Sequence, residues 1–250
     1  MKFSNFVPVL AAILAGVFYW WFSYRPAAAP LILLTVLVFN LLAAWANSRA
    51  SRQKLWWNFA LLPILAESIV LGYLTIVSTP LLVKILAAGL VLLVYVYWRF
   101  VYFYLNNPAR YTSFSLENLS FYVNFLLVFL LGALIFGLRA FLNYNLLLLL
   151  AVAALVLFLL IYQSVWMAKT APQGGYLLVN LLVLVELLWA FSFLPLNHNL
   201  LGFLWAGVYY LTAVLFSDKL NGKLSLKRLR AYGALLAVSW LILFLSARWL

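Results

Sequence analysis

The chain contains no cysteine and only one histidine, His198. Disulfide bonds, cysteine nucleophiles and zinc sites built from histidine or cysteine are therefore excluded. Acidic residues are almost as scarce, because 4 Asp and Glu stand against 16 Lys and Arg. A GxSG serine motif is also missing from the sequence. These absences remove much hydrolytic and metal chemistry, so we expect no catalytic activity, no cofactor and no bound metal.

Charged residues of both signs make up only 8% of the 250 residues, whereas 69% are hydrophobic. Soluble domains are about one-quarter charged and about half apolar, so most of this protein's surface cannot face water. A net charge of +12 would suggest nucleic acid as the partner of a soluble protein. Here the basic residues cluster between apolar segments, so we expect the partners to be the lipid bilayer and its anionic headgroups, with no nucleic acid.

A membrane-spanning helix needs roughly 17 to 25 apolar residues. No segment alternates apolar and polar residues as a membrane β-barrel would require. The sequence therefore predicts an all-α polytopic bundle of about nine spans, forming a single transmembrane domain over residues 1–250. The predicted spans are 6–23, 29–46, 55–77, 81–104, 119–138, 145–167, 176–195, 200–216 and 231–247. We expect the first span to be retained, since the bulky segment Phe18–Phe22 makes a poor signal-peptide cleavage region.

Basic residues predict the orientation of the spans, because they accumulate on the inner side of a membrane. If the N-terminus is inside, 12 of the 16 Lys and Arg residues lie inside and the C-terminus is outside. The longest connections, 105–118 and 217–230, are then both on the inner side. The inner residues expected at lipid headgroups are Arg49, Arg52, Lys54, Lys219, Lys223, Lys227, Arg228 and Arg230. Asp218 is expected to be a local counter-charge among the last five.

Other positions have roles predicted from local sequence. Tryptophans are expected at the membrane interfaces, where predicted helices end. These are Trp20, Trp21, Trp45, Trp56, Trp57, Trp98, Trp166 and Trp249. Ser115 is the expected N-cap of the fifth helix, with Glu117 in its first turn. The small pairs Ala12–Gly16 and Gly233–Ala237 have the spacing that lets membrane helices approach closely.

Two carboxyls fall in the middle of predicted spans, Glu67 and Glu186. A charge at that depth costs at least about 3 kcal/mol, so each must be neutral, partnered or in contact with water. One alternative is a pair of buried, protonated carboxyls that hydrogen-bond neighbouring helices. A second alternative is a cavity for a proton, a cation or a cationic solute, lined by the two glutamates together with Asn58 and Asn180. A third is contact with a partner protein's membrane helix.

An internal repeat is suggested by residues that recur at offsets of 118 to 122. Asn58 corresponds to Asn180, and Glu67 to Glu186. Four spans separate each pair, so the two copies would have the same orientation in the membrane, as in parallel transporter repeats. The predicted arrangement is 4+4+1, with copies at 1–104 and 119–219 and an extra helix at 231–247.

The segment ELLWAFSFLP, at 186–195, and the terminal SARWL resemble uncharacterised bacterial families of small polytopic inner-membrane proteins. This resemblance implies an inner (plasma) membrane location and assigns no activity. Together with the absences above, it favours a non-enzymatic membrane scaffold or accessory subunit that contacts another membrane protein. The competing hypothesis is a secondary transporter or ion pathway that uses Glu67 and Glu186.

Overall fold

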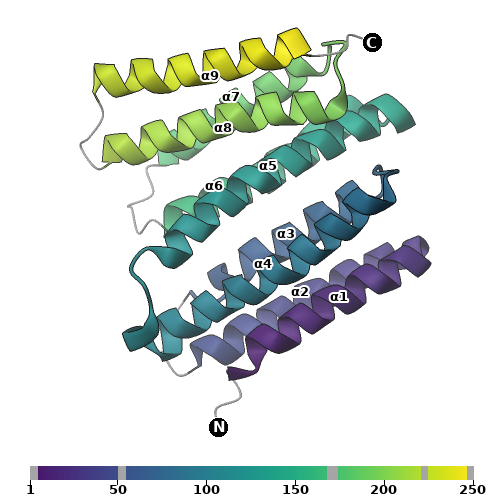
Figure 1. The fold of residues 1–250 in the computed structure, drawn as a ribbon, viewed down its shortest axis with the longest axis vertical. Helices are drawn as coiled ribbons and strands as arrows, with labels where there is room; N and C mark the ends of the chain where they lie inside the picture. Colours follow the sequence, from purple (N-terminus) through teal and green to yellow (C-terminus); the bar gives the residue numbers. More distant parts are fainter. Residues whose placement is uncertain (1–4, 50–54, 168–173, 221–224, 247–250) are drawn as a thin grey trace. The chain divides into compact units, whose positions relative to one another are not determined.

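The computed structural model describes residues 5–49, 55–167, 174–220 and 225–246, which form nine α-helices and no β-strand (Figure 1). The helices are α1 Val7–Tyr24, α2 Ala29–Ser48, α3 Asn58–Leu74, α4 Pro80–Asn106, α5 Ser115–Leu142, α6 Leu146–Met167, α7 Gly174–Phe191, α8 His198–Leu220 and α9 Leu226–Ser246. Two short 3₁₀ turns, η2 Pro26–Ala28 and η3 Pro108–Arg110, precede α2 and follow α4. The all-α prediction is confirmed.

Among the described residues, six helical segments are long and apolar enough to cross a membrane. They are Val7–Tyr24, Pro26–Ser48, Pro80–Asn106, Ser115–Leu142, Leu146–Met167 and His198–Phe216. The helix α3 and the part Leu177–Phe191 of α7 are also apolar but shorter. The chain thus has the helices of an integral membrane protein, whereas the nine spans and their orientation stay predictions.

The connection predicted at 217–230 is much shorter in the structure, because α8 continues to Leu220 and α9 begins at Leu226. Lys227, Arg228 and Arg230 therefore lie in the first two turns of α9 and not in a loop. These turns are continuous with an apolar helix, so they can be helical without an amphipathic pattern of their own. Three other residues predicted at headgroups lie outside the described residues: Arg52, Lys54 and Lys223.

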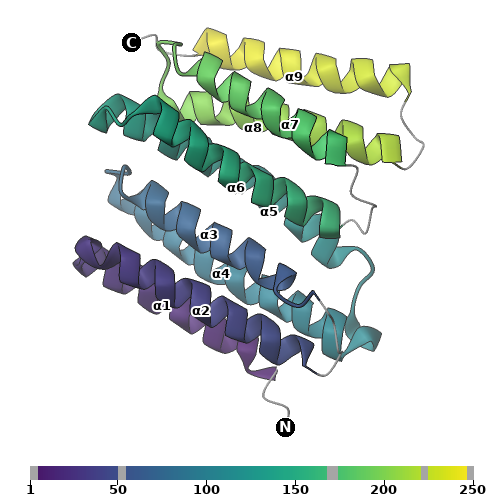
Figure 2. The same cartoon turned by 180° about the vertical axis from the view of Figure 1, so that it is seen from behind.

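The chain divides into two compact units. The first comprises residues 1–123 and 166–168 and contains α1 to α4 (Figure 2). Within it, α1 packs along α4, while α3 contacts α2 and α4. Most residues of α3 are buried, so this helix forms the core of the first unit. The helix continues through Pro63, four residues before Glu67.

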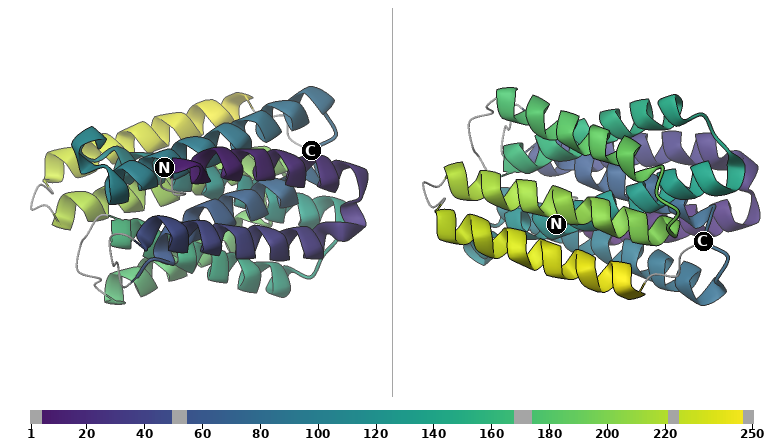
Figure 3. Two further views of the ribbon diagram at one scale, coloured as in Figure 1. Left: turned by 90° about the horizontal axis from the view of Figure 1, so that it is seen from below. Right: turned by 90° about the horizontal axis from the view of Figure 1, so that it is seen from above.

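The second unit comprises residues 124–165 and 169–250. In it, α8 lies between α7 and α9 (Figure 3). The helices α5 and α8 approach each other closely at Gly132 and Gly202. A Cβ atom at Gly202 would lie 2.6 Å from the backbone nitrogen of Ala133 and 2.8 Å from the carbonyl oxygen of Phe129. Only glycine fits there without a shift of the backbone.

The small-residue pairs predicted from spacing do not make such close crossings. A Cβ atom at Gly233 would meet no atom of the described residues within 4 Å, so the predicted packing role of this residue is wrong. At Gly16 the nearest atom is a methyl carbon of Val91 at 3.8 Å, which is an ordinary contact. The spacing thus identified a contact of α1 with α4 at Gly16, but it did not identify Gly132 and Gly202, where α5 and α8 approach more closely.

The predicted repeat requires four helices in each copy. Residues 1–104 hold α1, α2, α3 and most of α4, and residues 119–219 hold most of α5 with α6, α7 and most of α8. Similar aromatic hydrogen bonds occur in both halves: Tyr97 of α4 donates to a carbonyl of α3, and Trp205 of α8 donates to a carbonyl of α7. The repeat itself stays a prediction.

Candidate functional site

Glu67 lies in the middle of α3 and is only 2% exposed. Asn40 of α2 donates a hydrogen bond from Nδ2 to Glu67 Oε1 at 3.0 Å, and a second to the carbonyl oxygen of Val36 at 2.9 Å. Both amide hydrogens of Asn40 are therefore used. The burial expected for Glu67 is confirmed, and its carboxyl joins α2 to α3.

A third helix completes this arrangement through Trp98 of α4. The indole Nε1 donates to Asn40 Oδ1 at 3.2 Å, and both side chains have no exposed surface. We call Asn40, Glu67 and Trp98 the Asn40 cluster. Trp98 was predicted at the membrane interface; the structure shows that its indole N–H is satisfied inside the helix bundle, while its depth in the membrane stays a prediction.

Asn58 is not part of the Asn40 cluster. It is the first residue of α3, nine residues before Glu67, which corresponds to about 13 Å along a helix. Its side chain is fully buried, and neither the amide nitrogen nor the amide oxygen has a hydrogen-bond partner among the described residues. The adjacent backbone carbonyl of Phe59 accepts from the Tyr97 hydroxyl at 2.8 Å. Asn58 and Glu67 thus lie in separate polar environments.

Glu186 differs from its predicted counterpart. It lies in α7, within the second compact unit, and its side chain is exposed. In the part of the chain that the structure describes, it has no hydrogen-bond or ion-pair partner. Asn180 on the same helix is 5% exposed and faces the packed side. The alternative in which both carboxyls are buried is therefore wrong for Glu186.

The exposed face of α7 is a regular stripe, which we call the α7 stripe and define as Gly175, Val179, Leu182, Glu186 and Trp189. Its members are exposed, with exposed fractions of 62% for Val179, 49% for Leu182 and 51% for Trp189. Their spacing of four, three, four and three residues is that of the contact seam between two packed helices. The opposite face is fixed to α8 by the hydrogen bond from Trp205 Nε1 to the carbonyl of Leu184, 2.8 Å long.

A second buried polar network joins three helices of the second unit. Asn124 Nδ2 of α5 donates to Gln163 Oε1 at 2.9 Å and to Ser164 Oγ at 2.6 Å, both on α6. The Ser164 hydroxyl lies 3.3 Å from the hydroxyl of Tyr209 on α8. These hydrogen bonds supply partners inside the bundle, as polar groups in lipid require, although Asn124 Oδ1 is buried without a partner among the described residues.

Glu117 has the helix-end role predicted for it, but Ser115 does not cap the helix. The helix α5 begins at Ser115 itself, preceded by Phe114 with φ 64°. The Tyr111 hydroxyl takes the capping role: it donates to Glu117 Oε2 at 2.7 Å and accepts from the backbone N–H of Leu116 at 3.2 Å. Burial first, and then the hydrogen bond with Glu117, raises the pKa of Tyr111, so the phenol remains a donor.

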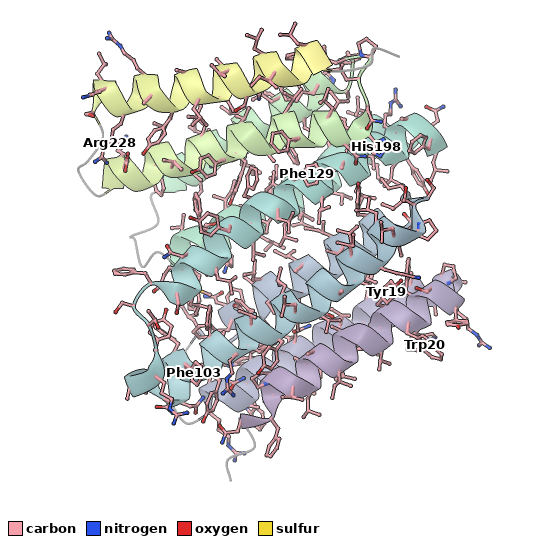
Figure 4. The ribbon with its side chains drawn as sticks, in the orientation of Figure 1. Tyr19, Trp20, Phe103, Phe129, His198 and Arg228 are labelled. Carbon is pink, nitrogen blue, oxygen red and sulfur yellow. The ribbon has the colours of Figure 1, made fainter. Side chains whose placement is uncertain are left out.

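The remaining predicted residues lie at helix ends. Arg228 pairs with Asp218 at 3.3 Å, which confirms the expected counter-charge (Figure 4). The guanidinium of Arg49 lies 5.1 Å from the ring centre of Trp45. His198, at the start of α8, packs its ring edge-to-face with Phe141 at 5.1 Å. Lys219, Lys227 and Arg230 are exposed.

The structure thus gives the two glutamates separate environments, one sealed and one exposed. Comparison with protein families, with curated proteins and with solved structures finds no match.

Proposed function

We propose that this integral membrane protein is a non-enzymatic scaffold or accessory subunit of the plasma membrane, and that it holds the membrane helix of a partner protein against the α7 stripe. The observation that carries the proposal is Glu186, which is exposed on an otherwise apolar helix face, five residues before the end of α7. A carboxyl facing lipid is costly, and a hydrogen-bonding partner at the same depth removes most of that cost.

The chemistry of the partner follows from the carboxyl. A membrane helix with a lysine or arginine at its middle would place a donor and an opposite charge against Glu186. Val179, Leu182 and Trp189 would pack around that pair. A second copy of this chain is a weaker candidate, because parallel α7 helices would bring one Glu186 against another and offer no opposite charge.

The alternative function is a secondary transporter or ion pathway through Glu67 and Glu186. A pathway needs water or substrate to reach both carboxyls. Glu67 is 2% exposed and its oxygen accepts from an amide within a tight helix contact, which supports a structural role. We therefore prefer the scaffold.

Binding can be tested with a designed membrane peptide. The full chain and a fluorescent 21-residue Leu/Ala helix with one central lysine are reconstituted together in vesicles, and association is measured by energy transfer. We expect association with wild type, and loss of it in Glu186→Leu and with a peptide that has leucine in place of its lysine. The control variant Glu117→Leu should bind normally. Equal association in all cases, or self-association of wild type that Glu186→Leu removes, would contradict the proposed partner.

Transport is tested separately in proteoliposomes that carry a pH or cation indicator. The scaffold proposal expects flux equal to that of protein-free vesicles for wild type and Glu186→Gln alike. A flux that wild type supports and a correctly folded Glu186→Gln variant loses would replace the scaffold with the pathway.

A further inference from the structure

A groove runs along the first unit between α1 and α4, with a volume of about 560 Å³. Its floor contains small side chains, Ala12 from α1 with Ala87 and Ala88 from α4. Val91 and Leu92 add apolar walls. The groove is therefore wide, shallow and largely apolar, and its size suits a flexible hydrocarbon chain better than a second helix.

The polar groups of the groove come from three residues, Lys84, Tyr19 and Tyr95. Lys84 is exposed in the second turn of α4, about 6 Å along the axis from the helix start. Tyr19 lies near the end of α1 and faces the same groove (Figure 4). In an antiparallel pair, the end of α1 and the start of α4 are neighbours, so Lys84 and Tyr19 belong to one end of the groove.

The ammonium group of Lys84 has no carboxylate partner within the described ranges. The acidic groups of the first unit are used elsewhere: Glu67 accepts from Asn40, and Glu117 from Tyr111. A lysine one turn inside a membrane helix can bring its ammonium to the headgroup level while its methylene stem stays among apolar groups. The counter-charge nearest to that level is the phosphate of an anionic lipid.

We propose that the groove between α1 and α4 binds one anionic phospholipid, with the lipid phosphate at Lys84 and an acyl chain along the alanine floor. The Tyr19 hydroxyl can donate to the phosphate or glycerol oxygens at the same end. Bulky residues at 12, 87 and 88 would fill the space that the chain occupies. This site is independent of the α7 stripe, and it lies at the end of α4 opposite to the basic residues predicted on the inner side.

Native mass spectrometry of the full chain in mild detergent tests the site with phosphatidylglycerol as the probe. We expect a bound lipid in wild type and about fivefold weaker binding in Lys84→Gln, the factor expected for one basic residue near an anionic surface. The matched control is Arg139→Gln, which removes an exposed basic residue in the second unit that is not among those predicted at headgroups, and it should bind as wild type does. Phosphatidylcholine should bind less than phosphatidylglycerol, and the difference should disappear in Lys84→Gln.

A second pair of variants tests the acyl chain. Ala88→Phe should fill the groove and weaken phosphatidylglycerol binding at least as much as Lys84→Gln, while Gly89→Phe, beside it but not in the groove, should not. Ala88 is exposed, so its replacement does not disturb the core. Equal lipid binding by all variants would show only non-specific annular lipid and overturn the proposal. Equal binding of soluble glycerol phosphate would show a phosphate site without a chain and would also overturn it.

Discussion

Asn40 and Glu67 are joined by a buried hydrogen bond of 3.0 Å that links α2 to α3 across 27 residues of sequence. Because Asn40 also accepts from Trp98, its side chain bonds to two helices at once. In lipid, such polar contacts replace the hydrophobic effect as the directional force between helices. The Asn40 side chain therefore connects α2, α3 and α4 near the centre of the first unit.

Replacing Asn40 with leucine should destabilise the first unit by about 1–3 kcal/mol, because Glu67 and the Trp98 N–H group are then buried without partners. Glu67→Gln should cost less than about 1 kcal/mol, since the glutamine oxygen can still accept from Asn40. The measurement is unfolding by sodium dodecyl sulfate in mixed micelles. Leu42→Ala, at a residue that is 57% exposed, is the control. If Asn40→Leu unfolds no earlier than this control, the Asn40 cluster does not stabilise the fold.

The α5–α8 crossing predicts an asymmetry between two glycine-to-alanine substitutions. Gly202→Ala adds a methyl group 2.6 Å from a backbone nitrogen and should cost roughly 1–3 kcal/mol, as overpacking does. Gly89→Ala adds the same group where no atom lies within 4 Å and should be neutral or slightly stabilising, because alanine favours the helix. Thermal denaturation in one detergent compares them, and equal melting temperatures would contradict the close crossing.

Removal of the Tyr111 hydroxyl should loosen the start of α5. Tyr111→Phe loses the donor to Glu117 and the acceptor of the Leu116 N–H group, a loss comparable to that of a helix cap, about 0.5–2 kcal/mol. Trypsin cleavage after Arg110, which is exposed, should become faster. Tyr122→Phe, at a residue that is 67% exposed, is the control for loss of a hydroxyl. Unchanged cleavage in Tyr111→Phe would show that another group caps the helix.

The lack of cysteine allows the orientation of the spans to be mapped directly, because every introduced thiol is unique. With nine spans and the N-terminus inside, Ser78→Cys and Asn197→Cys should react with a membrane-impermeant maleimide in intact cells. Ser113→Cys and Ser225→Cys should react only after the membrane is opened. Labelling of Asn197→Cys and Ser225→Cys from the same side would mean that α8 does not cross.

Much of the fold follows from the sequence, because the length of each apolar segment and the positions of the basic residues between segments can be read without knowing which helices are neighbours. All nine helices were predicted, and α9 was misjudged only at its start, where Lys227 and Arg228 continue an apolar helix. The direction in which a side chain points was not predictable. Glu67 and Glu186 have nearly the same local sequence setting, yet one is sealed and the other exposed, because neighbouring helices decide which face is covered.

Contacts between residues that are distant in sequence were equally unpredictable. Trp98 lies near the end of an apolar segment and was expected at the interface, since nothing near it in the sequence shows that Asn40 would accept a hydrogen bond from its indole N–H. The groove at Lys84 arises from two helices whose small residues line up only when they pack. Gly202 was missed although Ala206 lies four positions away on its own helix, because spacing does not show that Gly132 of α5 is its neighbour.

The hydrogen bonds of the Asn40 cluster also form in a fixed order while the chain is synthesised. Asn40 is translated 27 residues before Glu67 and 58 residues before Trp98, so α2 enters the membrane before the acceptor of Asn40 Nδ2 and the donor to Asn40 Oδ1 are present. The pair with Glu67 can form once α3 has entered, and the indole arrives only with α4. A chain that lacks Trp98 would therefore form a three-helix intermediate in which the Asn40 oxygen has no donor. Insertion of α4 supplies that donor.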